Sequence, residues 1–185
     1  MKYLFPCILF IVNSLSLYGQ TDNVYTEKVF RVNFINPGLE YEVPFHGNGV
    51  LSGGFGIGYE GNFEGLEESG PSGFQYEISP FIDIEYKQIY NLEKRNQKGK
   101  NTAYNSGNYW GLRSLSHFKA IKSNFTRKDD VNFLVGPVWG IQRKFGSFHF
   151  LFDIGPVYYF DTKGNSGFWP FNIQLNLGLD LKRKK

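Results

Sequence analysis

The sequence predicts an all-β fold, a closed antiparallel up-and-down transmembrane β-barrel of about eight strands. From Val29 onward the apolar residues recur at every second position, which is the period of a strand. Aromatic residues, which favour strands, make up 18% of the 185 residues. Past the N-terminal region no run of about 18 apolar residues occurs, so this chain can enter a membrane only as a closed barrel.

The N-terminus has the features of a secretory signal. Lys2 precedes an apolar run over residues 3–12, and small and polar residues follow to Gln20. Such a segment is too short to span a bilayer as a helix. We expect a signal peptide over residues 1–20, with a cut after Ser16 as the alternative.

The remaining chain divides into a short N-terminal lead, residues 21–27, and one barrel domain, residues 28–185. Cys7 is the only cysteine and lies in the signal. The mature chain therefore has no thiol, which excludes disulfides, thiol catalysis and cysteine metal sites.

The first strand segment, Lys28 to Phe45, changes phase at its centre. Phe30 and Val32 share one parity, whereas Leu39 and Tyr41 share the other. Either a bulge at residues 36–38 shifts the phase within one long strand, or Asn36-Pro37-Gly38 is a turn between two short strands. The predicted strand count is accordingly seven or eight.

The next two segments, residues 51–60 and 74–87, alternate regularly. Only Phe81 breaks the pattern of the second, because it falls on the polar face. Four further segments alternate in the same way, the first of them least regularly. They cover residues 109–118, 133–141, 150–160 and 171–182.

The distribution of side chains between the two faces favours a membrane barrel. Small and charged residues suit a narrow polar lumen, and bulky apolar residues suit lipid. Strands of ten or more residues match the roughly 9–11 needed to cross a bilayer. Aromatic residues near the predicted strand ends suit an interfacial girdle: Tyr59, Tyr76, Tyr86, Tyr109, Trp110, Trp139, Tyr158 and Trp169. A soluble lipocalin-like barrel, which also alternates, is the alternative.

Loop lengths predict a topology, because such barrels have short periplasmic turns and longer outer loops. Residues 46–49 and 145–147 are short connections and are assigned to the periplasm. The outward loops are residues 61–73, 119–130 and 162–167. Asn91 to Gly107 is then a long periplasmic connection, and an outer turn at residues 36–38 would supply an eighth strand.

Two segments resemble parts of small outer-membrane β-barrel proteins of the Bacteroidota type. The second segment is Gly136 to Arg143. The first runs from Tyr86 to Tyr109 and contains Asn91-Leu92-Glu93-Lys94-Arg95, Lys98-Gly99-Lys100-Asn101-Thr102 and Asn105-Ser106-Gly107-Asn108-Tyr109. They cover about a fifth of the chain. The resemblance implies a barrel of uncharacterised role and supplies no catalytic or ligand residues. The chain departs from the family at its end, where Leu181 is followed by Lys182 to Lys185 instead of a final aromatic residue.

Charged residues on the polar faces form a candidate lumen network. Its members are Arg31, Glu40, Glu42, Glu60, Glu77, Asp83, Glu85, Lys87, Arg113, Asp153 and Asp180. Charges of both signs in a narrow interior must pair or stay hydrated. With eight strands we expect a salt-bridged plug, and an ion-selective pore is the alternative.

The other motifs do not indicate a catalytic, cofactor or metal site. The glycine-rich residues 53–58 lack the lysine and helix of a phosphate-binding loop. The histidines His46, His117 and His149 have no metal-site spacing. Ser116-His117 and Ser147-Phe148-His149 are similar to the serine and histidine of barrel enzymes that trim lipopolysaccharide, but the residue order differs. We therefore predict no catalytic residues, no cofactor and no metal.

The long connection, residues 91–107, is the candidate interaction loop. Its basic residues are Lys94, Arg95, Lys98 and Lys100, and long loops are uncommon unless functional or disordered. They suit an acidic periplasmic partner, or anionic lipopolysaccharide if the topology is inverted. The basic tail and the formal charge of +3 give no reason to expect nucleic-acid binding.

The sequence thus predicts a cell outer-membrane barrel with a structural or partner-binding role and a plugged lumen. Its expected partners are outer-membrane lipid, lipopolysaccharide and a periplasmic or surface protein. The alternatives are a narrow channel, a lipid A-modifying barrel enzyme and a soluble ligand-binding barrel.

Overall fold

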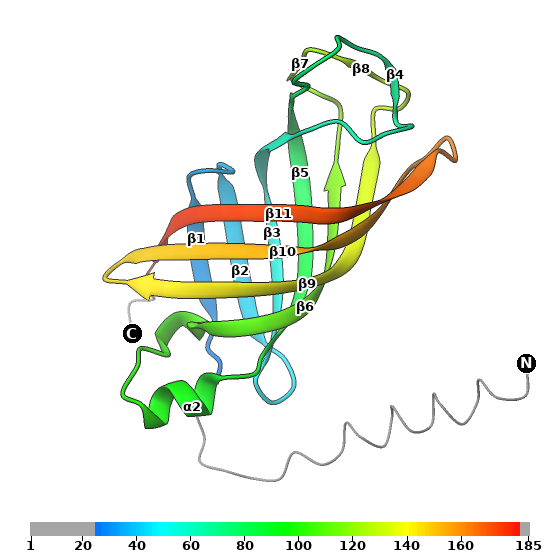
Figure 1. The fold of residues 1–185 in the computed structure, drawn as a ribbon. Coiled ribbons are helices and arrows are strands. Elements are labelled where there is room, and N and C mark those ends of the chain that lie inside the picture. The colour runs from blue at the N-terminus through cyan, green and yellow to red at the C-terminus, as the bar shows by residue number, and fades with distance from the viewer. Residues whose placement is uncertain (1–24, 182–185) are drawn as a thin grey trace, which may run out of the picture.

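A computed structural model describes residues 25–181 of the chain (Figure 1). The predicted signal peptide and the basic tail lie outside the described residues. Eight strands form the body of the fold. They are β1 (Val29–Asn33), β2 (Gly38–Pro44), β3 (Gly49–Glu60), β5 (Glu77–Ile89), β6 (Gly107–His117), β9 (Asn132–Phe145), β10 (Phe148–Asp161) and β11 (Ser166–Leu181).

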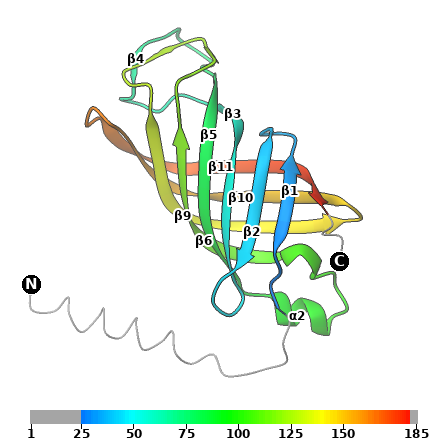
Figure 2. The ribbon, with the colours of Figure 1, turned by 180° about the vertical axis from the view of Figure 1, so that it is seen from behind.

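All eight strands pair antiparallel with two neighbours each. The pairing follows the chain from β1 through β2, β3, β5, β6, β9 and β10 to β11, and β11 pairs back with β1. The fold is therefore all-β, and its sheet rings round on itself (Figures 1 and 2). A two-residue strand, β7 (Lys122–Ser123), extends the edge of β5.

The phase change in the first segment is a turn, not a bulge. β1 and β2 pair from Val29 opposite Glu42 to Asn33 opposite Gly38, and residues 34–37 form the turn. The chain reverses there, so the side chains that face inward change parity. The alternative with two short strands is confirmed, and it supplies the eighth strand.

The two ends of the ring differ. At one end, called the α2 end, two short turns accompany the long connection, which folds as α2 (Leu92–Gln97) and a 3-10 turn, η1 (Ala103–Asn105). At the other end, called the β4 end, the two long loops pair through β4 (Glu67–Ser69) and β8 (Thr126–Arg127). The sequence predicted no helix, because six residues are too few to establish a helical period. No helix in the described residues is long and apolar enough to cross a membrane.

Polar residues fill the interior of the ring and apolar residues cover its exterior. Arg31 and Asp153 are fully buried, whereas Phe171 and Ile173 are 67% and 59% exposed. Along β11 the apolar residues face out and the polar residues between them face in or are half-buried. The predicted girdle position Tyr109 is wrong: it is buried, because it shares the inward parity of Arg113 and not the outward parity of Trp110.

β1 and β2 are shorter than the other six strands of the ring, so the wall extends less far toward the β4 end at this hairpin. β1 pairs with β11 only from Asn33 opposite Gly178 to Phe30 opposite Leu181, and the Phe34 amide donates to the Leu177 carbonyl. Among the described strands, residues 166–176 of β11 pair with β10 alone. We call this gap, between residues 166–176 of β11 and the turn at residues 34–37, the side notch.

Candidate functional site

The interior near the α2 end is organised around Arg31. Its guanidinium donates from Nε to Asp180 Oδ1 at 2.8 Å and from Nη2 to Glu42 Oε2 at 3.0 Å. A third carboxylate, Glu40, lies 3.1 Å from Nη1. The three acids come from β2 and β11, the two strands that flank β1, so one cation joins three neighbouring strands.

Lys87 of β5 reaches two of these carboxylates, Glu40 and Glu42, across the inner face of β3. Its Nζ donates to Glu42 Oε1 at 2.9 Å and to Glu40 Oε1 at 3.2 Å. It also contacts Gln142 Oε1 on β9 at 3.3 Å. Through these contacts the group joins β11, β1, β2, β5 and β9 across the interior of the ring.

The long connection closes this end of the ring. The side chain of Asn105 is 1% exposed and donates to Glu42 Oε2 at 2.8 Å, and the carbonyl of Asn105 accepts from Gln142 at 2.7 Å. Tyr104 and Asn105 have φ values of 55° and 60°, a strained region for residues with a side chain. Strain of this kind persists only where the surroundings enforce it, and here buried bonds do so.

An apolar layer accompanies that polar plug. Leu92 of α2 packs in a buried cluster with Val50, Ile89, Tyr109 and Val138. The connection is thus docked inward by both polar and apolar contacts. Its predicted basic residues instead face outward: Lys94, Lys98 and Lys100 are exposed, and Arg95 bonds to the Asn101 carbonyl.

The middle of the lumen holds a second group of charges. Arg113 donates from Nε and Nη2 to the carboxylate of Asp83, with the shorter distance 2.7 Å. Asp153 lies 3.9 Å from Arg113 Nη1 and accepts from the Tyr109 hydroxyl at 3.2 Å. Glu85 connects this group to the first one, because it lies 3.7 Å from Lys87.

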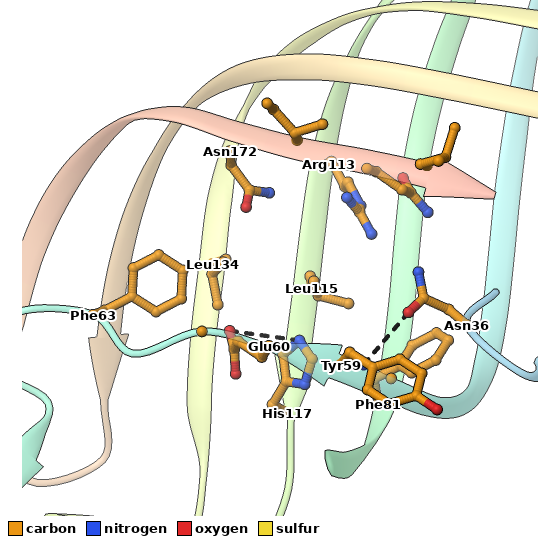
Figure 3. Close-up of a pocket in the computed structure, with 15 residues that line it drawn as sticks. Asn36, Tyr59, Glu60, Phe63, Phe81, Arg113, Leu115, His117, Leu134 and Asn172 are labelled. Atoms are coloured by element: carbon orange, nitrogen blue, oxygen red, sulfur yellow. Dashed lines mark hydrogen bonds and ion pairs between the residues drawn. The ribbon is translucent and has the colours of Figure 1, made fainter. Parts of the chain in front are cut away.

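A third group lies at the β4 end, where β3 stops and β5 starts. Glu60 and Glu77 are direct cross-strand partners, and His117 ends the next strand, β6. His117 Nε2 is 3.6 Å from Glu60 Oε1 (Figure 3). Nδ1 of His117 is 2.9 Å from the Ser79 hydroxyl. The serine that contacts His117 is thus Ser79 and not its sequence neighbour Ser116, because adjacent residues of a strand point to opposite faces.

A cavity of about 180 Å3 lies beside this third group. Glu60, His117, Phe81 and Arg113 line it from inside the ring. Other lining residues come from the side notch: Asn36, Asn172, Ile173, Gln174 and Leu175. The cavity therefore reaches the outside through the side notch. Phe81, which broke the predicted alternation, forms part of its lining.

The loops at the β4 end are tied to each other by polar contacts. The side chain of Asp129 accepts from the hydroxyl and the backbone amide of Thr162, the amide at 2.9 Å. The bond from the Thr162 hydroxyl lowers the pKa of the Asp129 carboxyl. The loop between β6 and β9 is thereby attached to the turn between β10 and β11.

The structure brings the predicted lumen residues together in these three groups. Arg31, Glu40, Glu42, Lys87 and Asp180 form the first, Asp83, Glu85, Arg113 and Asp153 the second, and Glu60 and Glu77 belong to the third. Sequence reasoning missed Asn105, Gln142 and Arg127, whose Nε lies 3.1 Å from Glu77 Oε2 in the third group. Gln142 lies on a predicted inward face, but nothing in the sequence indicates that a distant connection folds back to meet it.

Comparisons with known proteins add no relative: no protein-family model, no curated protein and no solved structure matches the chain.

Proposed function

We propose that this chain is an outer-membrane β-barrel, closed to solutes, that has a structural or partner-binding role. One observation carries the proposal: the ring has charged residues inside and large apolar residues outside. A lumen filled by side chains and an apolar outer band are the features of small membrane barrels.

The exposed apolar residues argue against the soluble alternative. Leu112, Leu175 and Leu177 are each more than 40% exposed on the outer wall, and aromatic residues such as Tyr158 and Trp169 flank them. Soluble proteins rarely leave an apolar surface of this extent in contact with water. A lipocalin-like barrel would also need an apolar interior, whereas this interior holds Arg31 and Lys87.

The polar groups of the interior support a barrel without conductance. Arg31 and Lys87 bridge the lumen through shared carboxylates, and Asn105 seals the end below them. An ion would have to displace buried, mutually paired charges in order to pass, which is unfavourable in a low-dielectric interior. In this proposal the α2 end lies in the periplasm, and the β4 end is extracellular.

The partner-binding role would fall to exposed, ordered surfaces at the two ends. The lysines of α2 and of the residues after it, Lys94, Lys98 and Lys100, face away from the lumen and suit an acidic periplasmic partner. At the other end, the paired strands β4 and β8 present a fixed surface to the cell exterior.

Two measurements test the proposal. The mature chain should fractionate with the outer membrane and should migrate faster on a gel before heating than after it. In planar bilayers it should give no stable conductance. A chain found in the soluble periplasm would refute membrane insertion, and a stable large conductance would refute the closed lumen.

The side notch favours a second candidate, binding of a lipid chain from the membrane. The cavity is lined by Ile173 and Leu175, which are exposed on the outer wall, and by Asn172 and Gln174, which are half-buried. At about 180 Å3 it holds the end of an acyl chain and not a whole lipid. Lipid retained through purification should be lost in Gly58→Leu, which fills the cavity, and kept in Gly53→Leu; equal retention would argue against this candidate.

A further inference from the structure

Three potential metal ligands converge at the β4 end from three consecutive strands of the ring. Glu60 ends β3, Glu77 begins β5, and His117 ends β6. One ligand atom from each lies within 4.8 Å of the other two. Their side chains are buried, with 7%, 1% and 5% of the surface exposed for Glu60, Glu77 and His117.

Each of the three side chains is held at one atom by a neighbour. Asn132 donates to Glu60 Oε2 at 3.3 Å. Arg127 Nε lies 3.1 Å from Glu77 Oε2. Ser79 holds His117 Nδ1 at 2.9 Å. These contacts leave the other oxygen of each carboxylate, and Nε2 of the imidazole, for a further partner.

No described residue supplies a hydrogen bond to those two oxygens, Glu60 Oε1 and Glu77 Oε1. The distance of 3.6 Å from Glu60 Oε1 to His117 Nε2 is too long for one. A buried carboxylate oxygen without a partner is unfavourable, because the energy of removing it from water is not recovered. A bound cation would remove this penalty for both oxygens at once.

The spacing of the ligand atoms suits a small tetrahedral ion. With bonds of roughly 2.0–2.2 Å, adjacent ligand atoms around Zn²⁺ lie roughly 3.3 Å apart. The three atoms here lie within 4.8 Å of one another, so side-chain rotations would bring them to that spacing. An imidazole with two carboxylates is a transition-metal ligand set, whereas Ca²⁺ and Mg²⁺ prefer oxygen alone.

We propose that Glu60, Glu77 and His117 bind one divalent transition-metal ion, with Zn²⁺ the best match. Ser79 is the positioning residue: it accepts the Nδ1 proton of His117 and so directs the Nε2 lone pair toward the ion. Glu60 and His117 also line the cavity, so the fourth coordination position faces a space that a water or a small ligand can enter. The site is built by the ring itself and does not depend on membrane insertion.

The test uses the full mature chain, refolded in detergent and treated with EDTA. Co²⁺ should give visible absorption bands of tetrahedral intensity that saturate at one equivalent, and Zn²⁺ should displace it. Ca²⁺ and Mg²⁺ at the same concentration should not. Zn²⁺ should also raise the unfolding temperature, because an ion that binds only the folded state stabilises it.

Variants identify the ligands. His117→Gln and Glu60→Gln should weaken Zn²⁺ binding by well over tenfold, and Ser79→Ala by about tenfold, the usual effect of losing a group that orients a ligand. His149→Gln is the matched control, since His149 is also buried in the ring and lies 3.8 Å from a carboxylate, Asp180. It should bind Zn²⁺ like the parent chain.

Folding of each variant is checked by circular dichroism, and Glu77→Gln replaces any variant that does not fold. Absence of a one-equivalent Co²⁺ spectrum in the parent chain would overturn the proposal. Equal weakening in His117→Gln and His149→Gln would overturn it as well. A chain that fractionates as a soluble protein would contradict the proposed membrane function and leave this test unchanged.

Discussion

Arg31 Nε lies 2.8 Å from Asp180 Oδ1, and the two residues are direct cross-strand partners on β1 and β11. This ion pair therefore joins the first strand of the ring to the last. The same guanidinium holds Glu42 of β2, so the seam of the ring depends on one buried cation.

Replacing that cation should strongly destabilise the fold. In Arg31→Met, Asp180, Glu40 and Glu42 lose their shared partner, and removal of one member of a buried ion pair costs about 3–5 kcal/mol. The measurement is the free energy of unfolding in detergent by guanidinium titration. Lys94→Met, at an exposed position, is the control and should change that free energy by less than about 0.5 kcal/mol. Equal effects would show that Arg31 is not the centre of the seam.

Arginine substitutions on the two faces of β11 should differ. Leu175 is 43% exposed on the outer wall, and Leu175→Arg should cost about 2–4 kcal/mol if that wall faces lipid near the bilayer midplane. Gln174 is half-buried beside the cavity, so Gln174→Arg should cost less. Refolding titrations in lipid vesicles compare the two. Equal losses would contradict the assignment of faces.

Opening the plug should change both stability and conductance. Asn105→Ala removes the bond to Glu42 Oε2 and the bonds to the backbone of Glu27, which should cost about 1–3 kcal/mol of unfolding free energy.

Shortening residues 91–107 to four residues would remove those bonds and would also remove Leu92 from its buried cluster. We expect the shortened chain to be less stable than the parent and to give transient conductance in planar bilayers. A silent and fully stable shortened chain would show that the connection seals nothing.

Two inward-facing glycines, Gly136 and Gly155, have no space for a larger side chain. A Cβ on Gly155 would lie 2.0 Å from the Pro137 carbonyl oxygen, and one on Gly136 would lie 2.0 Å from that of Pro156. Gly155→Ala should therefore push β9 and β10 apart and lower the unfolding free energy by about 1–3 kcal/mol. Gly53→Ala is the control, because a Cβ there meets no atom within 4 Å. A neutral Gly155→Ala would mean that the two strands separate easily.

Alternation predicted which side chains share a face, because neighbouring residues of a strand point in opposite directions. It also indicated that the polar face is the inner one, through the charges it carries. Leu175 lies outside and Arg31 inside, as the pattern requires. The parity change before Leu39 could be explained in two ways from the sequence, and the pairing of β1 with β2 decides for the turn.

Other features depend on contacts between distant segments and left no local signal. Glu60, Glu77 and His117 come together only because the ends of three strands meet at one level of the ring. The connection at residues 91–107 has a polar composition that predicts a solvated loop, yet Asn105 and Leu92 anchor it in the interior. Phe81 broke the alternation for a reason outside its own strand, since it borders the cavity.

Beside the side notch, one backbone edge of β11 is paired with β10 and the other edge is unpaired. Along residues 172–176, where the pairing with β10 is regular, the N–H and C=O groups of every second residue face β10, and those of the residues between them face the notch, where the described chain offers no strand. In hydrogen–deuterium exchange, amides of the first kind should be protected as strongly as the ring itself, and those of the second kind should exchange early. Amide protection over residues 172–176 would then alternate residue by residue, and the point beyond which both kinds are protected would mark where β1 begins to cover β11.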